Sequence, residues 1–310
     1  MLKILFCADS PNAEKWFKKI SQVFAHCEVR QWQPNDTAPA DYAIVWKPPA
    51  AMLEGRTDLK AIFVLGAGVD AILQLGSALP SGVPLIRLDD AGMAVQMAEY
   101  VSYALLRHFR RFDTYELHRN AKQWQCLAPN KKSEFGVGIL GLGVLGQRIL
   151  QAVQHFEFPV HGWSRSEKHI EGVTCYHGQQ ELSAFLNASR VLVCILPLTS
   201  ETRHILNRAT LEQLPRGAYL INVARGAHVV EQDLLELIQS GHIAGATLDV
   251  FQHEPLPADH PFWQEPRIQI TPHESALSLF EQSVAQIAEK MQALEQGQTV
   301  RGVVDQSKGY

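Results

Sequence analysis

The sequence has no apolar run that approaches the roughly 20 residues needed to cross a lipid bilayer. Its first residues, MLKILFCADS, contain one lysine and a short apolar run that ends at Asp9. A signal peptide would need a longer apolar region and a small-residue cleavage site. The N-terminus is typical instead of a first buried strand, and we expect no membrane segment.

Cysteine and positive charge are also scarce. The five cysteines are odd in number, widely scattered and without a CxxC pair, which fits a reducing cytoplasm better than a disulfide framework. The net charge of −4 offers no basic face for nucleic acid. There is no internal repeat and no low-complexity tract. These features predict a soluble cytoplasmic protein that binds neither nucleic acid nor membrane.

Short apolar runs alternate with longer amphipathic ones along the 310 residues, which is the pattern of α/β domains with parallel sheets. The length suggests two domains. We expect two groups of buried strands, the first at 2–8, 27–32, 41–46, 59–65 and 84–88, and the second at 135–140, 159–164, 190–196, 218–223, 245–250 and 268–271.

One long helix is expected between the two groups, from Met93 to Arg119. At 1.5 Å per residue it would span roughly 40 Å, enough to bridge two lobes or to form a subunit contact. The polar residues that follow, up to Glu134, indicate an excursion or linker. A final helix is expected from about Leu277 to Gln296.

A GxGxxG motif, GLGVLG, stands between the strand at 135–140 and a following helical stretch. This strand–turn–helix context is the one that a dinucleotide-binding motif requires. Gly141 would make the tight turn, Gly143 would let the backbone approach a pyrophosphate, and Gly146 would allow close packing of helix on strand. The motif predicts a dinucleotide site.

The stretch GWSRS, at 162–166, indicates which dinucleotide is preferred. Arg165 stands roughly 20 residues beyond the glycine motif, where an acidic residue usually accepts a hydrogen bond from the ribose 2′-hydroxyl. No carboxylate is present here. A 2′-phosphate would instead gain the guanidinium of Arg165 and the hydroxyls of Ser164 and Ser166. We therefore predict NADPH, with NADH as a weaker alternative.

Three ionisable residues follow predicted strands of the second group. Arg225 follows the strand at 218–223, Glu254 lies beyond 245–250, and His273 follows 268–271. Ligands of open α/β sheets bind at the carboxyl ends of strands, so these side chains would converge. Together they form a proton-transfer set in which the carboxylate orients the imidazole. The nearby His253, Asp259 and His260 lack the spacing of a zinc site, so we expect no metal.

The chain resembles the D-isomer-specific 2-hydroxyacid dehydrogenase family over essentially its whole length. The motifs that carry the resemblance occur in order: LGAGVD (65–70), GLGVLG (141–146), GWSRS (162–166), LPLTSET (196–202), INVARG (221–226), LDVFQHEPLP (248–257) and TPH (271–273). The resemblance implies two Rossmann-like lobes. A discontinuous, flavodoxin-like substrate domain would comprise 1–102 and 276–310, and a doubly wound NADP-binding domain would comprise 103–275. It also implies an active site in the cleft between them and a homodimer built around the long helix.

The resemblance further implies an NADPH-dependent reductase of small 2-keto acids, with glyoxylate and hydroxypyruvate favoured. The nicotinamide would deliver hydride to the keto carbon. His273 would donate the proton, Glu254 would stabilise its imidazolium form, and Arg225 would hold the substrate carboxylate and polarise the keto oxygen.

Other residues are expected to bind the two ligands. Trp46 and Lys47 end a strand and would line the cleft, and the amides of Gly68 and Val69 would bind a carboxylate at a helix start. Trp124 resembles a tryptophan that some relatives insert into the neighbouring subunit's site. Besides the residues named above, the cofactor contacts are expected to include Val144, Leu145, Leu196, Pro197, Thr202, Val223, Ala224, Arg225, Asp249 and His273.

Two alternatives stay open at this point. One is a dehydrogenase of a larger D-2-hydroxy acid; a phosphorylated one would need further cations, for which only Lys47 and Arg87 are candidates. The other is a dinucleotide-sensing binding protein, against which the complete set of three ionisable residues argues. Glu274 and Ser275 depart from the family's small or apolar residues after the catalytic histidine, and this departure bears on the choice of substrate more than on the reaction type.

Overall fold

The computed structural model describes every residue from 1 to 310, and the chain forms two compact units. The first unit contains Met1–Met93 and Ser278–Tyr310, and the second contains Ala94–Leu277. The chain therefore leaves the first unit at the start of one long helix and returns to it shortly before the last helix. The bounds of these units differ from those predicted from sequence, where the first boundary lies later in that long helix, and the division into substrate and cofactor domains stays a prediction.

The first unit contains a five-stranded parallel sheet in the order β2-β1-β3-β4-β5, which is the flavodoxin-like order. Its middle strands are almost wholly buried, as their apolar sequences predict. The strands are β1 Lys3–Ala8, β2 Glu28–Gln31, β3 Tyr42–Trp46, β4 Ala61–Val64 and β5 Leu85–Arg87. The helices are α1 Ala13–Val23, α2 Ala50–Leu53, α3 Asp70–Leu73, the 3₁₀ turn η1 Gly76–Ala78, and α10 Phe280–Glu295.

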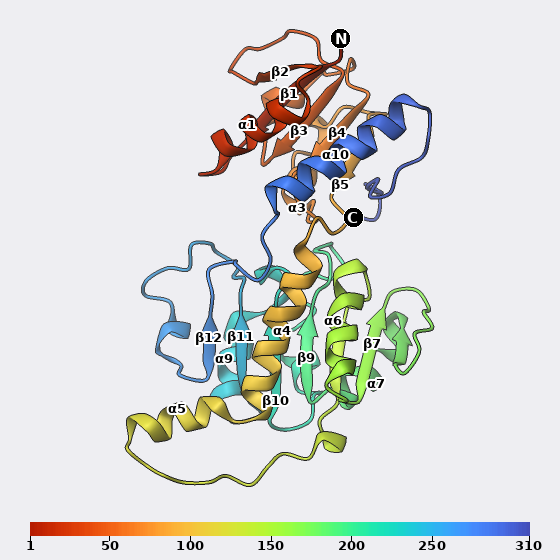
Figure 1. The fold of residues 1–310 in the computed structure, drawn as a ribbon. Helices are drawn as coiled ribbons and strands as arrows, with labels where there is room; N and C mark the ends of the chain where they lie inside the picture. The colour runs from red at the N-terminus through yellow and green to blue at the C-terminus, as the bar shows by residue number, and fades with distance from the viewer. The chain divides into compact units, whose positions relative to one another are not determined.

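Helix α10 packs on α1 although the two are far apart in sequence (Figure 1). The rings of Trp16 and Phe280 lie 4.3 Å apart, and the Tyr42 hydroxyl donates to the Glu295 carboxylate over 2.6 Å. These contacts explain why the C-terminal segment folds with the N-terminal third of the chain.

The second unit contains a seven-stranded parallel sheet in the order β12-β11-β10-β9-β6-β7-β8. This is the doubly wound Rossmann order, in which the direction of strand succession reverses between β6 and β9. The fold class predicted from sequence is confirmed. The strands are β6 Val137–Leu140, β7 Val160–Ser164, β8 Thr174–His177, β9 Val191–Cys194, β10 Ala218–Asn222, β11 Ile243–Leu248 and β12 Ile268–Ile270.

Helices cover both faces of this sheet (Figure 1). On one face α4 and α6 pack over a core that includes Val101, Ile149 and Val193. On the other, α7, α8 and α9 pack over a core that includes Phe185 and Leu234. The helical elements are α4 Met93–Phe109, α5 Phe112–Asn120, η2 Lys132–Glu134, α6 Val144–His155, α7 Gly178–Ala188, α8 Arg208–Leu211, η3 Gly226–His228, α9 Glu231–Gln239 and η4 Pro261–Gln264.

The prediction of a single helix from Met93 to Arg119 is wrong. α4 ends at Phe109, Arg111 adopts a left-handed conformation with φ 55°, and α5 begins at Phe112. α4 buries Val101 and Leu105 on the sheet, whereas α5 has no buried residue. The continuous pattern contains no glycine or proline to mark the break. The helix breaks at the point where its buried face ends, and only the fold defines that point.

The strand β8 was not predicted. Its sequence, TCYH, is short and has no fully buried residue, because β8 is the edge strand of the sheet. Edge strands lack the apolar signal of central ones. No helix of the structure is both long enough and apolar enough to span a membrane.

Candidate active site

The glycine motif lies at the carboxyl end of β6, beside the switch point of the sheet. Gly141 has a φ of +119°, and a Cβ there would meet the Ile195 carbonyl oxygen at 2.8 Å. A Cβ at Gly146 would overlap the Gly141 carbonyl oxygen, whereas one at Gly143 would meet nothing within 4 Å. The first and last glycines are thus required by packing. The middle one faces open space that a pyrophosphate could fill, as a dinucleotide site needs.

The first turn of α6 follows this loop. Val144 and Leu145 are the first two residues of α6, and their side chains are exposed and partly buried, respectively. Their amides therefore lie at a helix N-terminus, which favours anions. The residues present at this loop therefore fit a dinucleotide.

Ser164, Arg165 and Ser166 end β7 and begin the loop after it. Arg165 and Ser166 are exposed, but Ser164 is buried and its hydroxyl donates to the Ser166 carbonyl over 2.8 Å. Since a serine hydroxyl has one hydrogen, Ser164 stabilises the turn in this arrangement. The exposed groups that could meet a 2′-phosphate are therefore the Arg165 guanidinium and the Ser166 hydroxyl.

The loop after β9 contains Leu196, Pro197 and Thr202. Leu196 is buried, and the Thr202 hydroxyl donates to the Pro197 carbonyl over 2.7 Å while accepting from the Thr199 amide over 2.8 Å. Thr202 therefore closes this loop on itself. The single hydroxyl hydrogen of Thr202 is donated within the chain and not to a ligand in this arrangement.

Glu254 and His273 form the shortest polar link among the predicted catalytic residues. His273 Nδ1 lies 2.8 Å from Glu254 Oε2, and Glu254 Oε1 accepts from the Phe251 amide over 3.0 Å. Burial opposes ionisation of Glu254, but these two hydrogen bonds and the charges of His273 and Arg225 outweigh it. The pKa of the Glu254 carboxyl consequently lies below its usual value.

Arg225 lies in the turn after β10, with the buried Val223 and Ala224 before it. A Cβ on Gly226 would overlap the Phe251 backbone, so this glycine lets the Arg225 turn approach the segment that precedes Glu254. The Arg225 charge is close enough to lower the pKa of Glu254. The structure thus brings Arg225, Glu254 and His273 together at the carboxyl ends of β10, β11 and β12.

Two buried polar residues that sequence reasoning missed support the Arg225 turn. Asn222 Nδ2 donates to the Arg225 carbonyl over 3.0 Å. His228, which is fully buried, has its Nδ1 3.2 Å from the Arg225 amide and its Nε2 3.3 Å from the Pro197 carbonyl. The only signal in the sequence is a histidine three residues after Arg225. This spacing does not indicate a contact unless the turn between the two residues is known.

Asp249 is fully buried, and its backbone carbonyl accepts from the His273 amide. Its carboxylate accepts from the Thr271 hydroxyl over 2.6 Å and from the amides of Glu274 and Ser275 over 2.8 and 2.9 Å. Glu274 is held at its backbone and keeps an exposed side chain, whereas Ser275 is buried. The carboxylate of Asp249 therefore faces the chain that carries His273.

Apart from Arg225 and His273, the predicted substrate residues belong to the first unit. The Trp46 ring lies against Gly66, where a Cβ would meet it at 2.5 Å, and Lys47 follows with a left-handed φ of 46°. The helix expected after Gly68 and Val69 is the single turn α3, so it adds little dipole to their amides.

Arg87 Nη1 lies 3.4 Å from the Ala67 carbonyl, which places this cation at the loop between Gly66 and Gly68.

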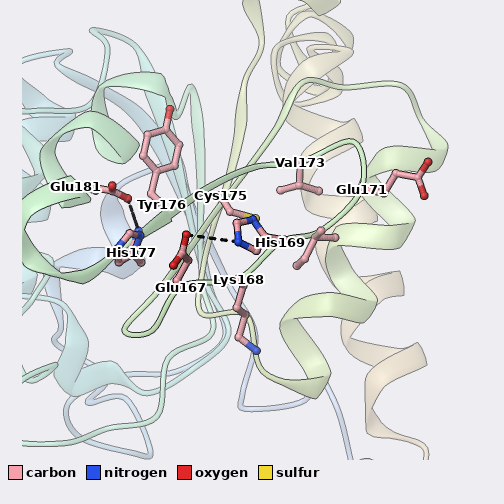
Figure 2. Close-up of a pocket in the computed structure, with 10 residues that line it drawn as sticks. Glu167, Lys168, His169, Glu171, Val173, Cys175, Tyr176, His177 and Glu181 are labelled. Carbon is pink, nitrogen blue, oxygen red and sulfur yellow. Dashed lines mark hydrogen bonds and ion pairs between the residues drawn. The ribbon is translucent and has the colours of Figure 1, made fainter.

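A separate cavity of about 430 Å³ lies beyond Ser166, under the 167–173 loop and beside β8 (Figure 2). It includes three glutamates and two histidine–glutamate pairs, and none of Arg225, Glu254 and His273. Such a lining does not suit an anionic dinucleotide.

Nowhere in the chain do three His, Cys, Asp or Glu side chains group so that they could hold a metal ion. His260, near the residues weighed as zinc ligands, pairs with Glu231.

Comparison with known proteins gives one consistent family. A model described as D-isomer specific 2-hydroxyacid dehydrogenase, NAD binding domain, matches residues 102–275. The chain is 50% identical to glyoxylate/hydroxypyruvate reductase A of Serratia proteamaculans (strain 568) and 46% identical to that of Yersinia enterocolitica serotype O:8, with 100% of both proteins covered in each case.

Solved structures agree. A D-isomer specific 2-hydroxyacid dehydrogenase from Xanthobacter autotrophicus Py2, in complex with NADPH and MES, is 38% identical with a TM-score of 0.93 and 99% of both chains covered. An NADPH-dependent glyoxylate/hydroxypyruvate reductase from Sinorhizobium meliloti, in complex with NADP and sulfate, is 35% identical with a TM-score of 0.92 and 100% of both chains covered. The resemblance inferred from the motifs is confirmed.

Proposed function

The chain belongs to the D-isomer specific 2-hydroxyacid dehydrogenase family, and from this premise we propose that it reduces small 2-keto acids with NADPH. Glyoxylate and hydroxypyruvate are the substrates, as the names of the relatives indicate. The observation that carries the proposal is the His273–Glu254 pair, 2.8 Å apart, with the Arg225 charge acting on the same carboxylate. This set can supply a proton and bind an anionic substrate at one place.

The second unit holds the cofactor. The loop at Gly141, Gly143 and Gly146 and the first turn of α6 bind the pyrophosphate, and Arg165 and Ser166 bind the 2′-phosphate. When bound, the reduced nicotinamide supplies a hydride to the substrate's keto carbon. The further contacts proposed for it come from Leu196, Pro197, Val223, Ala224 and the surroundings of His273.

His273 supplies the proton. Its Nδ1 is engaged with Glu254, so its Nε2 is the atom that donates to the substrate oxygen. Glu254 remains ionised because its pKa is lowered, and it stabilises the imidazolium form of His273. Hydride on carbon and a proton on oxygen together convert the keto acid to the 2-hydroxy acid, and His273 regains its proton from solvent.

Arg225 binds the substrate carboxylate, because a guanidinium can donate two parallel hydrogen bonds to it. The first unit is the substrate domain, and Trp46, Lys47 and the amides of Gly68 and Val69 complete the substrate contacts. An extra cation in that unit, Arg87, would matter only for a larger or phosphorylated acid.

The protein acts as a homodimer in the cytoplasm. The large exposed hydrophobic residues Phe112, Leu117 and Trp124, on α5 and in the segment that follows, support self-association, and all five cysteines are free. Sedimentation of the purified chain would test the oligomeric state directly.

The loss of reduced-nicotinamide absorbance with glyoxylate tests the function, comparing NADPH with NADH. We expect a preference for NADPH in kcat/KM that falls about 10- to 100-fold in the Arg165→Ala protein, because a charge-assisted contact to phosphate is lost. The exposed Arg301, in the first unit, gives the matched control, Arg301→Ala.

Equal use of both cofactors by the native protein would contradict the NADPH assignment. Turnover with larger keto acids only would favour the larger D-2-hydroxy acid. Cofactor binding without turnover across a keto-acid panel would favour a dinucleotide sensor.

A further inference from the structure

The segment from Thr271 to Leu277 carries His273 but belongs to no helix or strand. It runs from the end of β12 to the last residue of the second unit. His273 itself has a φ of 60°, a left-handed conformation that is uncommon for a residue with a Cβ. The position of the imidazole therefore depends on what binds this segment.

Asp249 binds the segment from inside the unit. Its carboxylate accepts from Thr271, Glu274 and Ser275, and its backbone carbonyl accepts from the His273 amide over 2.9 Å. Four bonds thus surround His273. One of them already binds Thr271 at the first end of the segment, but none reaches Leu277 at the other end.

Helix α4 holds both ends. Gln96 Nε2 donates to the Leu277 carbonyl over 2.9 Å, and Gln96 Oε1 accepts from the Leu277 amide over 3.2 Å. The Tyr100 hydroxyl lies 2.5 Å from the Thr271 hydroxyl. Gln96 and Tyr100 are four residues apart on the helix, so their side chains lie on the same face.

The direction of the Tyr100 bond follows from counting hydrogens. Thr271 has a single hydroxyl hydrogen, and it is donated to Asp249. The Tyr100 hydroxyl must therefore donate to Thr271, which completes a chain from Tyr100 through Thr271 to the buried carboxylate. The Tyr100 ring packs on the same core as Ala276, and this burial is the main cause that raises the pKa of Tyr100 to about 12, so the donor keeps its proton at neutral pH.

We propose that Gln96 and Tyr100 are positioning residues for the reduction: as a clamp on α4, they hold the 271–277 segment at both ends and so keep His273 against Glu254. The link to catalysis rests on the proposed role of His273 as the proton donor. The clamp itself is a property of the ligand-free protein and can be tested without any reaction.

Hydrogen exchange of the ligand-free protein, followed by mass spectrometry, is the first test. We expect peptides covering 271–277 to exchange about five-fold faster in Tyr100→Phe and in Gln96→Ala, the factor that one neutral hydrogen bond commonly contributes. Tyr103→Phe is the matched control, because Tyr103 lies on the same helix with an exposed side chain. Peptides of β6 and α6 should not change in any variant.

Turnover with glyoxylate is the second test. Tyr100→Phe should lower kcat about five-fold and shift the alkaline limb of its pH profile, while NADPH affinity stays within two-fold. The same change made in a Thr271→Val background should have no further effect, because the partner hydroxyl is already gone. Thr271→Ser should retain wild-type behaviour, because it keeps that hydroxyl.

Unchanged exchange in both clamp variants would overturn the proposal, and so would faster exchange with unchanged kcat and pH profile. If the wild-type protein reduced no keto acid, the proposed function would fail by itself. The exchange data would then still decide whether the clamp exists.

Discussion

Two of the histidine–carboxylate pairs in the second unit have similar separations and similar exposure. His273 and Glu254 are 2.8 Å apart, with side chains 47% and 36% exposed. His177 and Glu181, in the cavity beside β8, are 3.1 Å apart and both 43% exposed (Figure 2). Neither distance nor exposure therefore distinguishes a proposed acid from an ordinary surface pair.

The surroundings of the two pairs differ. Glu181 lies in the first turn of α7 and accepts from the backbone amide of His177, whose ring lies beside the same carboxylate, so the pair is local to one helix start. Glu254 and His273 come from two loops, and Arg225 from a third loop acts on the same carboxylate. A carboxylate–imidazole pair becomes a candidate catalytic pair when other chain segments supply a charge for the substrate and fix the ring.

The histidines give the sharpest way to test this difference. We expect His273→Asn to lower kcat about 10²- to 10⁴-fold, the usual contribution of a general acid. His177→Asn should retain kcat within two-fold at saturating NADPH. Steady-state reduction of glyoxylate measures both, and equal losses in the two variants would show that the comparison is mistaken.

The carboxylates should differ less. Glu254→Gln removes a charge-assisted hydrogen bond from His273, so kcat should fall about 10- to 100-fold. Glu181→Gln should leave the rate profile unchanged. A pH–rate profile for each variant provides the measurement, and an unaltered profile for Glu254→Gln would argue against its role.

The smallest effect concerns stability. A carboxyl with a lowered pKa stabilises the fold while ionised, so the contribution of Glu254 is complete above the ordinary glutamate pKa of about 4.3 and disappears as pH falls through the lowered value. The Tm of the native protein should exceed that of Glu254→Gln by a few degrees at pH 7, and the difference should shrink as pH falls below the ordinary glutamate pKa. Solvent screening keeps this contribution small, since the pair is partly exposed. A difference independent of pH would contradict the assignment.

Much of the fold was predictable because its signals are local. Buried parallel strands appear as continuous apolar runs, and β1, β6 and β10 lie within the predicted ranges. The glycine motif was equally clear, since Gly141 and Gly146 are required by backbone geometry within one turn. The edge strand β8 and the end of α4 at Phe109 were missed, because edge position and the extent of a buried face are defined by distant segments.

The candidate site was predictable only in part, for the same reason. Arg225, Glu254 and His273 each follow a strand, and parallel strands bring their carboxyl ends to one edge of the sheet. The hydrogen bonds that the Ser164 and Thr202 hydroxyls donate within the chain could not be predicted. Each acceptor is a backbone carbonyl whose position depends on how the loop folds. Tyr100, Asn222 and His228 had no recognisable motif.

The sequence by itself determined the two parallel sheets, the dinucleotide loop, the residues of the proposed proton-transfer set and the family. Each of these rests on residue type and spacing within one element or one turn. Only the tertiary structure decided that Tyr100 donates to Thr271, that Asp249 binds the chain behind His273, and that the Arg225 charge acts on Glu254. Those interactions join residues from separate elements, and hydrogen bonds reach only about 3 Å, so they exist only after the chain has packed.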